Sequence, residues 1–116
     1  MKQSFRLKHR QDIKRVLQDG QSFVHEAIVL RKKSNECDQN RVAVIAGRSL
    51  GGAVQRNYAK RRLRSAYYNL MTDLQPGNDF IFIARKPILS IDYEEIVFTM
   101  RRLFKQAGVM KENERS

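Results

Sequence analysis

The chain has 116 residues, of which 41% are hydrophobic and 30% are charged, and its formal net charge at pH 7 is +11. That length suits one domain with a single core, and that composition argues against a disordered chain. No apolar run reaches the roughly 20 residues that cross a bilayer, and the polar segment Met1–Arg10 lacks the apolar stretch of a secretory signal. The one cysteine, Cys37, cannot form an internal disulfide, so we expect an inert thiol and a cytoplasmic protein.

The first predicted element is a helix over about Lys8–Asp19. Its apolar residues Ile13, Val16 and Leu17 are three and four positions apart, which places them on one face. Gly20 suits the position just after the helix end, where glycine is common.

Three apolar segments predict strands. Ser22–Lys33 is interpreted as a strand region that is one strand or two short strands broken near His25. Arg41–Gly47 follows the polar loop Ser34–Asn40 and is typical of a buried strand. Phe80–Ala84 is rich in aromatic and β-branched residues, which favour strands, and it follows a Pro-Gly-Asn turn.

Two longer helices are predicted in the second half of the chain. One covers about Ala53–Met71 and follows the turn Gly51–Gly52, and the other covers about Asp92–Ala107. The last helix keeps apolar residues at helical spacing throughout. Its first residue and Glu95 resemble a capping box, and Gly108 can end it.

The order helix, strands, helix, strand, helix predicts an α/β protein, most simply with the helices on one face of a small mixed sheet. The sequence contains no repeat, linker or low-complexity segment, so residues 1–116 are interpreted as a single domain. Its ordered core is expected from about residue 5 to residue 108, and a polar C-terminal tail is expected over residues 109–116.

The positive charge is concentrated in one part of the chain. The 34 residues of Gln39–Thr72 contain seven Lys or Arg and no Asp or Glu, so they supply seven of the net eleven positive charges. Such a segment repels itself unless a polyanion lies against it, which makes a nucleic acid the natural partner.

Most of these charges share one face of the predicted helix Ala53–Met71. At 100° per residue, five polar side chains fall within about 140° of one another, and we call them the basic stripe: Arg56, Asn57, Lys60, Arg61 and Arg64. The adjacent face is apolar and can dock on the sheet, with Arg62 on its far flank. Guanidinium and ammonium groups bind phosphate oxygens, and the Asn57 amide can bond a sugar hydroxyl, a base edge or a hydrated ion.

Two other interpretations of the basic stripe are open. A solvated charged face is the plainer one, but such faces usually mix both signs, and like charges four residues apart, as in Arg56 and Lys60, are unfavourable. A membrane-surface helix would need a free apolar face, whereas the predicted strands need that face as cover. We favour phosphate binding.

The sequence shows no catalytic constellation. His9 and His25 have neither a metal-ligand spacing nor a cysteine partner, and the acids Asp92, Glu94 and Glu95 stand where helix capping explains them. Neither a Ser–His–Asp order nor a nucleophile elbow nor a Walker loop is present. By itself the sequence therefore predicts a binding protein with no catalytic residue and no certain metal ligand.

Three aromatic side chains are candidates for stacking on unpaired bases: Phe23, Tyr58 and Tyr68. Most other rings recur at positions that a strand or helix would bury, so they are interpreted as core.

The segment from Gly51 to Arg64 resembles the signature of the bacterial ribonuclease P protein subunit. In that signature an Arg-Asn pair opens a basic helix and is followed by Lys-Arg-x-Leu-Arg, as in Arg56–Arg64 here. The flanking order agrees, with Arg6–Lys8 ahead of the first helix and Ile83–Arg85 near the end. The resemblance covers almost all of residues 5 to 107.

The resemblance implies a two-layer α/β (α+β) fold of the ribosomal protein S5 domain 2-like type. Its topology is helix, three strands, helix, strand, helix, with a mixed four-stranded sheet and a left-handed crossover, where general rules predict a right-handed one. It implies a protein component of ribonuclease P that binds the catalytic RNA and the 5′ leader of precursor tRNA and assists removal of that leader. RNA and bound Mg²⁺ would carry the chemistry, and neither a membrane nor a protein partner would be required.

The resemblance also implies roles for individual residues. The basic stripe and Arg48 would meet the catalytic RNA. A cleft between the first helix and the sheet would hold the leader, and the matching positions are Ile13, Leu17 and Arg31, with Phe23 as a further candidate. The family commonly has aromatic rings in this cleft, whereas this chain has Ile13, Leu17 and Arg31 at the matching positions. The leader contact is therefore expected to use aliphatic groups and the charge of Arg31.

Two rival functions stay open. A structural RNA-binding protein, such as a ribosomal component, has the same kind of composition and would bind RNA without stimulating cleavage of precursor tRNA. A protein-only nuclease would cleave RNA with no RNA partner, although the sequence offers no constellation for it.

Overall fold

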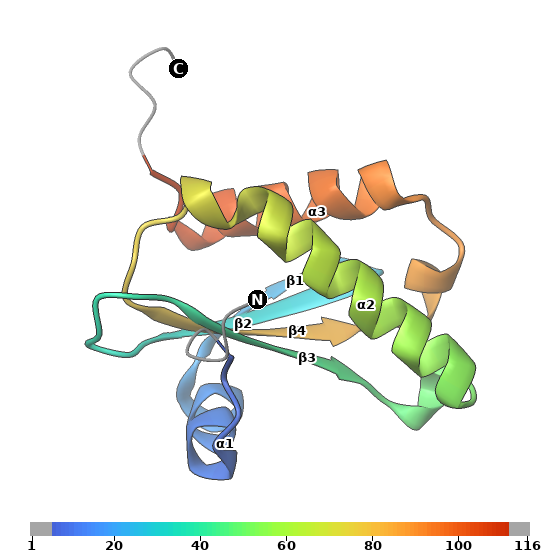
Figure 1. Ribbon diagram of the computed structural model, residues 1–116, viewed down its shortest axis with the longest axis horizontal. Coiled ribbons are helices and arrows are strands. Elements are labelled where there is room, and N and C mark those ends of the chain that lie inside the picture. Colours follow the sequence, from blue (N-terminus) through green and yellow to red (C-terminus); the bar gives the residue numbers. More distant parts are fainter. Residues whose placement is uncertain (1–5, 112–116) are drawn as a thin grey trace.

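The computed structural model of the protein describes residues 6–111 (Figure 1). The helices and strands follow one another as α1 (Arg10–Asp19), β1 (Gln21–Val24), β2 (Ile28–Ser34), β3 (Arg41–Ala46), α2 (Ala53–Leu70), β4 (Asn78–Ala84) and α3 (Tyr93–Ala107). Short 3₁₀ turns lie between them: η2 (Arg48–Leu50), η3 (Met71–Asp73) and η4 (Lys86–Leu89). The expected start of the core at residue 5 and the expected tail beyond residue 111 lie outside the described residues.

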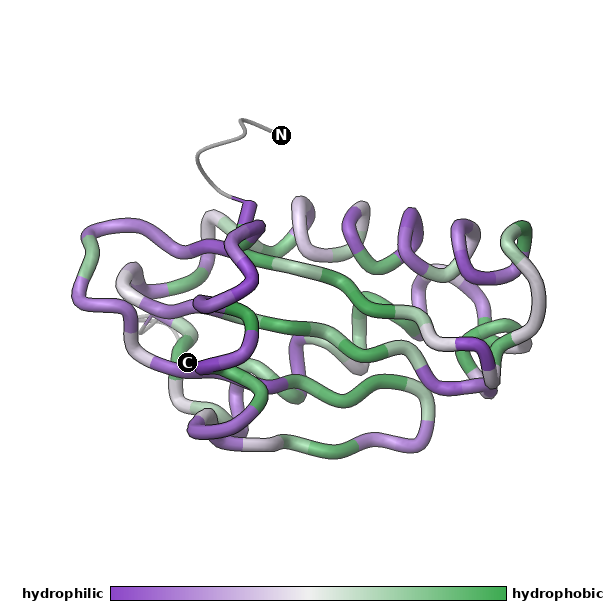
Figure 2. Tube along the Cα trace, turned by 90° about the horizontal axis from the view of Figure 1, so that it is seen from below, coloured by the Kyte–Doolittle hydropathy of each residue, from purple (hydrophilic) through white to green (hydrophobic). Residues whose placement is uncertain are grey.

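The four strands form one mixed sheet in the order β1-β2-β4-β3. β2 is antiparallel to both β1 and β4, whereas β3 is parallel to β4, with Ala46 opposite Ala84. The connection between the parallel strands passes through α2 above the sheet and is left-handed (Figure 1 and Figure 2). The topology that the family resemblance implied is therefore confirmed. This includes the left-handed crossover, where general rules predict a right-handed one.

α2 and α3 cover one face of the sheet and enclose the larger core. Four buried rings meet at its centre: Tyr67 of α2, Phe80 and Phe82 of β4, and Phe104 of α3. Phe80 and Phe104 pack edge to face with centroids 5.1 Å apart, and Tyr67 lies 6.2 to 6.3 Å from each of the other three rings. This packing fixes which side of α2 faces the sheet and, with it, which side faces solvent.

α1 lies on the opposite face of the sheet, below it in Figure 1. There Val16 joins Leu7 and Ile81 in a second, smaller core. The expectation that the helices share one face is therefore wrong for α1. The reason lies in β4, whose central residues are buried on both sides, so that a helix on one side alone would leave apolar surface in water. Figure 2 shows how continuously apolar the strands are when seen from this side.

The predicted element ends agree closely with the structure. The break near His25 is confirmed, because the Nδ1 atom of His25 accepts a hydrogen bond from Ala27 N–H (3.1 Å) in the turn between β1 and β2. At the start of α3, Asp92 Oδ1 accepts a hydrogen bond from Glu95 N–H (2.8 Å). At its end, Gly108 adopts the left-handed conformation (φ 73°) that favours glycine.

The ordered structure continues beyond the predicted end of the core. Val109 is buried, and its carbonyl accepts a hydrogen bond from Gln75 N–H (2.8 Å), while Met110 pairs with Leu74. Residues 109–111 are therefore tied to the folded domain, with Val109 in its core and Lys111 exposed on its surface. No helix within residues 6–111 is long and apolar enough to cross a membrane.

Candidate nucleic-acid interface

The basic stripe lies on α2 as predicted from its spacing. Five residues of the adjacent face are buried against the sheet and α3: Ala59, Leu63, Ala66, Tyr67 and Leu70. Asn57 and Arg61 are exposed, and Arg56, Lys60 and Arg64 are half-buried. Within residues 6–111, none of the five stripe side chains has an ion-pair or hydrogen-bond partner, and the three ion pairs in that range belong to Arg15 and Arg41.

Arg62 behaves differently from its neighbours in the chain. Its Nη1 atom donates to the carbonyl of Ile91 (3.0 Å), and its guanidinium lies 5.0 Å from the centroid of the Tyr58 ring. This side chain therefore holds α2 to the segment before α3. Its exclusion from the stripe on the helical wheel is consistent with this placement.

The start of α2 is shaped by a glycine pair. Gly51 has a φ of 127°, a conformation that side chains rarely adopt, and Gly52 N–H donates to Oε1 of Gln55 (3.1 Å). Arg48 is exposed in η2, immediately before this turn. The turn thus brings Arg48 to the end of α2 where the stripe begins.

α1 is held against the sheet by Arg31 of β2. One atom, Nη2, donates to the carbonyls of Leu17 (2.6 Å), Gly20 (3.1 Å) and Val16 (3.3 Å), which lie at the end of α1. Carbonyls at a helix C-terminus carry partial negative charge and attract a cation. The Arg31 side chain therefore binds the backbone carbonyls at the end of α1 and holds that helix in place. The strand pattern in the sequence did not indicate this role.

A glycine is required at position 20 because the end of α1 and strand β2 lie very close to it. A Cβ atom on Gly20 would lie 2.4 Å from the carbonyl oxygen of Val16 and 2.8 Å from that of Lys32. Its φ is −76°, so space and not a left-handed conformation selects glycine here.

A second tie joins α1 to the sheet through charge. Arg41 of β3 donates from Nε and Nη2 to the two carboxylate oxygens of Asp79 of β4 (2.8 and 2.7 Å), and from Nη1 to Asp12 of α1 (3.3 Å). Asp79 also accepts from the Asn35 amide (2.9 Å) and is buried. The hydrogen bond to Asp79 raises the pKa of Arg41 above its usual range, against the effect of burial.

Two hollows flank the part of the sheet that α1 leaves open. The first, the edge hollow, has a volume of about 260 Å³ and lies along the edge strand β3 beside Val42, Ala43 and Val44. Its walls include Ile13 of α1 and Arg64 of the stripe. It therefore brings together one residue predicted for the leader and one predicted for the catalytic RNA.

The second hollow, the strand-end hollow, has a volume of about 680 Å³ and lies where β3 and β4 end. Its apolar lining includes Val29 and Ile83. Its polar lining consists of Ser49, the cations Arg85 and Lys86, and one acid, Glu26. Arg85 and Lys86 were not among the predicted site residues. The sequence could have indicated them, because parallel strands in register bring the residues that follow both strands to the same end of the sheet. In this protein that end also carries Arg48.

The predicted leader residues do not all share one surface. Ile13 and Leu17 both lie on α1, where Leu17 is 38% exposed, and Arg31 of β2 bonds the end of that helix. Phe23 is half-buried and packs against the core under α2 and α3, on the other face of the sheet. It pairs with the buried Leu30 in the adjacent strand, so the register of β1 and β2 sets its direction.

The described residues offer no evident metal site. Within residues 6–111, no group of three or more His, Cys, Asp or Glu could hold a metal ion. A basic helix face without ion pairs among the described residues, carried on a small α/β domain, defines a small nucleic-acid-binding protein.

The sequence model of the family described as Ribonuclease P matches residues 1–108. A curated relative, the ribonuclease P protein component of Listeria innocua, is 31% identical over 113 residues, which are 97% of this chain and 95% of the relative. The chain belongs to this family of ribonuclease P protein components. It is therefore a subunit of the metal-dependent ribonucleoprotein that processes the 5′ ends of tRNA, and it assembles with the RNA of that enzyme.

Solved structures agree with this assignment. The RNase P protein of Staphylococcus aureus superposes with a TM-score of 0.82 at 28% identity, over 92% of this chain and 98% of that chain. A mutant of the Staphylococcus aureus protein, described as having defective mRNA degradation activity, gives a TM-score of 0.84 at 26% identity, over 92% and 91% of the two chains.

Proposed function

We propose that the basic stripe and Arg48 bind the catalytic RNA of ribonuclease P, and that the surface beside α1 holds the 5′ leader of precursor tRNA. The observation that carries the first part is the absence of any acceptor for the five stripe side chains within residues 6–111. Four cations held on one rigid helix repel one another until a polyanion neutralises them.

Arg56 adds a second argument. Its Nε atom is buried without a hydrogen-bond partner among the described residues. A buried donor with no acceptor is unfavourable by about 1–3 kcal/mol. Rotation of this side chain toward a phosphate would remove that cost, so Arg56 favours the RNA-bound state.

The leader surface contains fewer of the predicted residues than the sequence resemblance implied. Ile13 and Leu17 supply aliphatic contact beside α1, while Arg31 is engaged with the end of α1 and positions that helix. Phe23 lies on the other face of the sheet, so we leave it out of the leader surface. Arg85 and Lys86, at the strand-end hollow, join the surface as cations that can follow a sugar–phosphate backbone.

We propose that Mg²⁺ is the metal of the complex and that the RNA partner holds it. The protein then lowers the Mg²⁺ requirement by neutralising phosphates and fixing the RNA in place, and no step of the chemistry passes through a protein ligand. We place the complex in the cytoplasm, by analogy with the bacterial relatives.

Reconstitution tests the proposal. Purified protein, a bacterial ribonuclease P RNA and precursor tRNA should give accurate 5′ cleavage at low Mg²⁺, and K60A/R64A should raise the Mg²⁺ needed. L17D should weaken binding of precursor tRNA while leaving binding of mature tRNA, which has no leader, unchanged. Equal losses for both RNAs would contradict the leader surface, and unchanged cleavage with K60A/R64A at low Mg²⁺ would contradict the stripe.

The same assay separates the rival functions. Binding without stimulation of cleavage would support a structural RNA-binding protein. A reaction with protein and messenger RNA but no RNA partner tests cleavage by the protein alone. Cleavage there would support a protein-only nuclease.

A further inference from the structure

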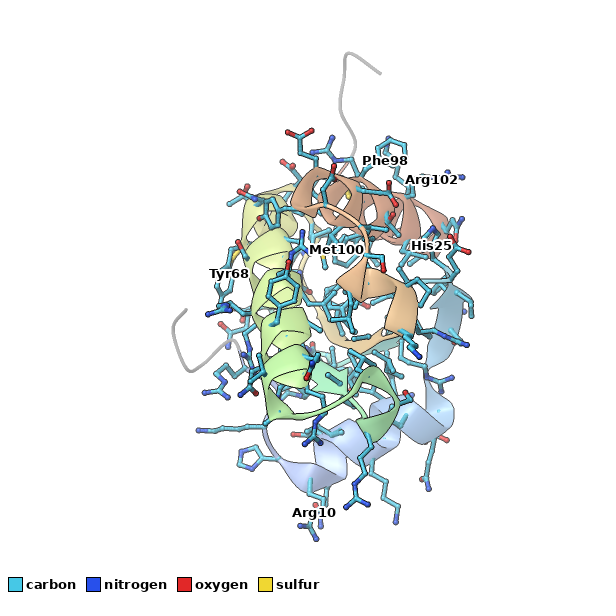
Figure 3. The ribbon with its side chains drawn as sticks, turned by 90° about the vertical axis from the view of Figure 1, so that its right-hand side faces the viewer. Arg10, His25, Tyr68, Phe98, Met100 and Arg102 are labelled. Atoms are coloured by element: carbon cyan, nitrogen blue, oxygen red, sulfur yellow. The ribbon has the colours of Figure 1, made fainter. Side chains whose placement is uncertain are left out.

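A third hollow lies away from both proposed RNA surfaces. It has a volume of about 400 Å³ and sits between one flank of α3 and the turn after β1, at the sheet edge opposite β3. Phe98 and Arg102 of α3 and His25 of the turn contribute to its walls, and all three lie on the same side of the molecule in Figure 3. It shares no residue with the basic stripe or with the other two hollows.

An exposed aromatic ring forms one wall. Phe98 is 60% exposed, whereas the apolar residues Ile96, Met100 and Phe104 of α3 are buried in the core. The guanidinium carbon of Arg102 lies 5.9 Å from the centroid of the ring, in the range of a cation–π contact. The pair presents a flat apolar platform beside a positive charge, which is the arrangement on which unpaired bases stack.

The polar groups of the hollow are complementary to one base edge. His25 Nδ1 accepts from Ala27 N–H, so in the neutral ring the proton sits on Nε2, which is a donor. Glu95 lines the hollow one turn before Phe98, and its carboxylate has no partner within residues 6–111. The hollow thus offers an imidazole donor and a free carboxylate next to a stacking platform.

We infer that this hollow binds a single unpaired guanine nucleotide. Guanine carries two adjacent donors, N1–H and the N2 amino group, which one carboxylate can accept together, and its O6 and N7 atoms accept from a donor such as His25 Nε2. Adenine presents one amino group beside an acceptor and would face the carboxylate with a lone pair. The inference concerns a contact additional to the proposed function and uses none of its residues.

The test is a titration of the full chain, followed by amide resonances in nuclear magnetic resonance spectra. Guanosine 5′-monophosphate should shift the resonances of Val24, His25, Phe98 and Arg102, and the adenosine, cytidine and uridine monophosphates should shift them less. F98A should weaken the affinity for the guanosine nucleotide by about fivefold or more, the loss expected when a base no longer stacks on a ring. E95Q should reduce the preference for guanosine over adenosine.

Y68L is the matched control, because Tyr68 is another exposed ring but lies on α2, away from the hollow (Figure 3). It should leave the guanosine affinity unchanged. The inference is overturned if no nucleotide shifts these resonances at millimolar concentration, if all four shift them equally, or if Y68L and F98A lose the same affinity. Shifts that depend on protein concentration without nucleotide would instead assign the hollow to contact with a second copy, and would also overturn it. None of these outcomes affects the cleavage assay that tests the proposed function.

Discussion

Arg61 and Arg62 are adjacent in the chain, yet Arg61 is exposed and has no partner within residues 6–111, while Arg62 donates to Ile91 and lies over Tyr58. Two residues of one type therefore have separate tasks. R61A should leave the free energy of unfolding within about 0.5 kcal/mol of the parent, as is usual for surface changes. It should also make the slope of log affinity against log salt shallower by about 0.7 to 0.9, the contribution of one phosphate contact.

R62A should show the opposite result. Loss of the hydrogen bond to Ile91 and of the contact with Tyr58 should lower the free energy of unfolding by about 1 to 2 kcal/mol. The salt slope of RNA binding should not change. Urea unfolding and filter binding at several salt concentrations measure both quantities, and equal effects of R61A and R62A on the salt slope would contradict the division of tasks.

Arg31 should tolerate no replacement that keeps only its charge. R31K retains a cation, but a single ammonium at the end of a different stem cannot reproduce the three bonds to the end of α1. We expect R31K to lower the free energy of unfolding by about 1.5 to 3 kcal/mol, the range for hydrogen bonds that involve a charged group. K33M, two residues along the same strand, is the control and should have little effect. Full stability of R31K would show that charge alone suffices.

The two glycines Gly20 and Gly47 allow a matched comparison. G20A would place a Cβ atom 2.4 Å from a backbone oxygen, so the end of α1 must shift, and we expect a loss of about 2 kcal/mol or more. G47A meets nothing within 4 Å and should change stability by less than about 0.5 kcal/mol. Thermal unfolding of both variants measures the difference, and similar losses would contradict the packing argument.

Removal of the Asp79 carboxylate should be far more costly than removal of Asp12. The Asp79 side chain is 5% exposed and bonds Arg41 through both oxygens, whereas that of Asp12 is 19% exposed and bonds it once at 3.3 Å. D79N should cost about 2 to 4 kcal/mol, because it removes the charge of a buried carboxylate that pairs with Arg41 through both oxygens. D12N should cost under about 1 kcal/mol. A double-mutant cycle with R41Q measures each coupling, and equal couplings would contradict the geometry.

Tyr67 should limit stability in alkali. Burial raises its pKa to about 12, with a smaller contribution from Tyr68. Because the folded state disfavours the phenolate, this stabilisation is complete below the unfolded pKa near 10 and is lost as the pH rises toward about 12. We expect Y67F to resist alkaline unfolding, with an advantage that approaches about 2 to 3 kcal/mol near pH 12. Y58F, a control on the protein surface, should show no such gain.

Much of the fold follows from local pattern. The His25 break, the Asp92 cap and the Gly108 end were predicted because each depends on residues within four positions. The stripe was predicted because helical spacing alone decides which side chains share a face. The placement of α1 was not, since the apolar face of Ile13, Val16 and Leu17 is the same whichever side of the sheet it covers.

The features that escaped prediction all join distant parts of the chain. Arg41 and Asp79 are 38 positions apart, and Arg31 meets the end of α1 only once β1 has folded back on β2. Phe23 points to the α3 side because of a register that no single strand specifies. Such contacts depend on tertiary geometry, which composition and periodicity do not contain.

The edge hollow has one further implication for the assembled enzyme. Ile13 and Arg64 stand on opposite faces of the sheet and still share a wall, since β3 is the outermost strand between them. Under the proposed function, a 5′ leader that lies along α1 reaches the catalytic RNA by passing around the edge strand β3. The width of the single strand β3 then sets the distance between the two nucleic acids, and the covalent geometry of the backbone keeps that distance constant.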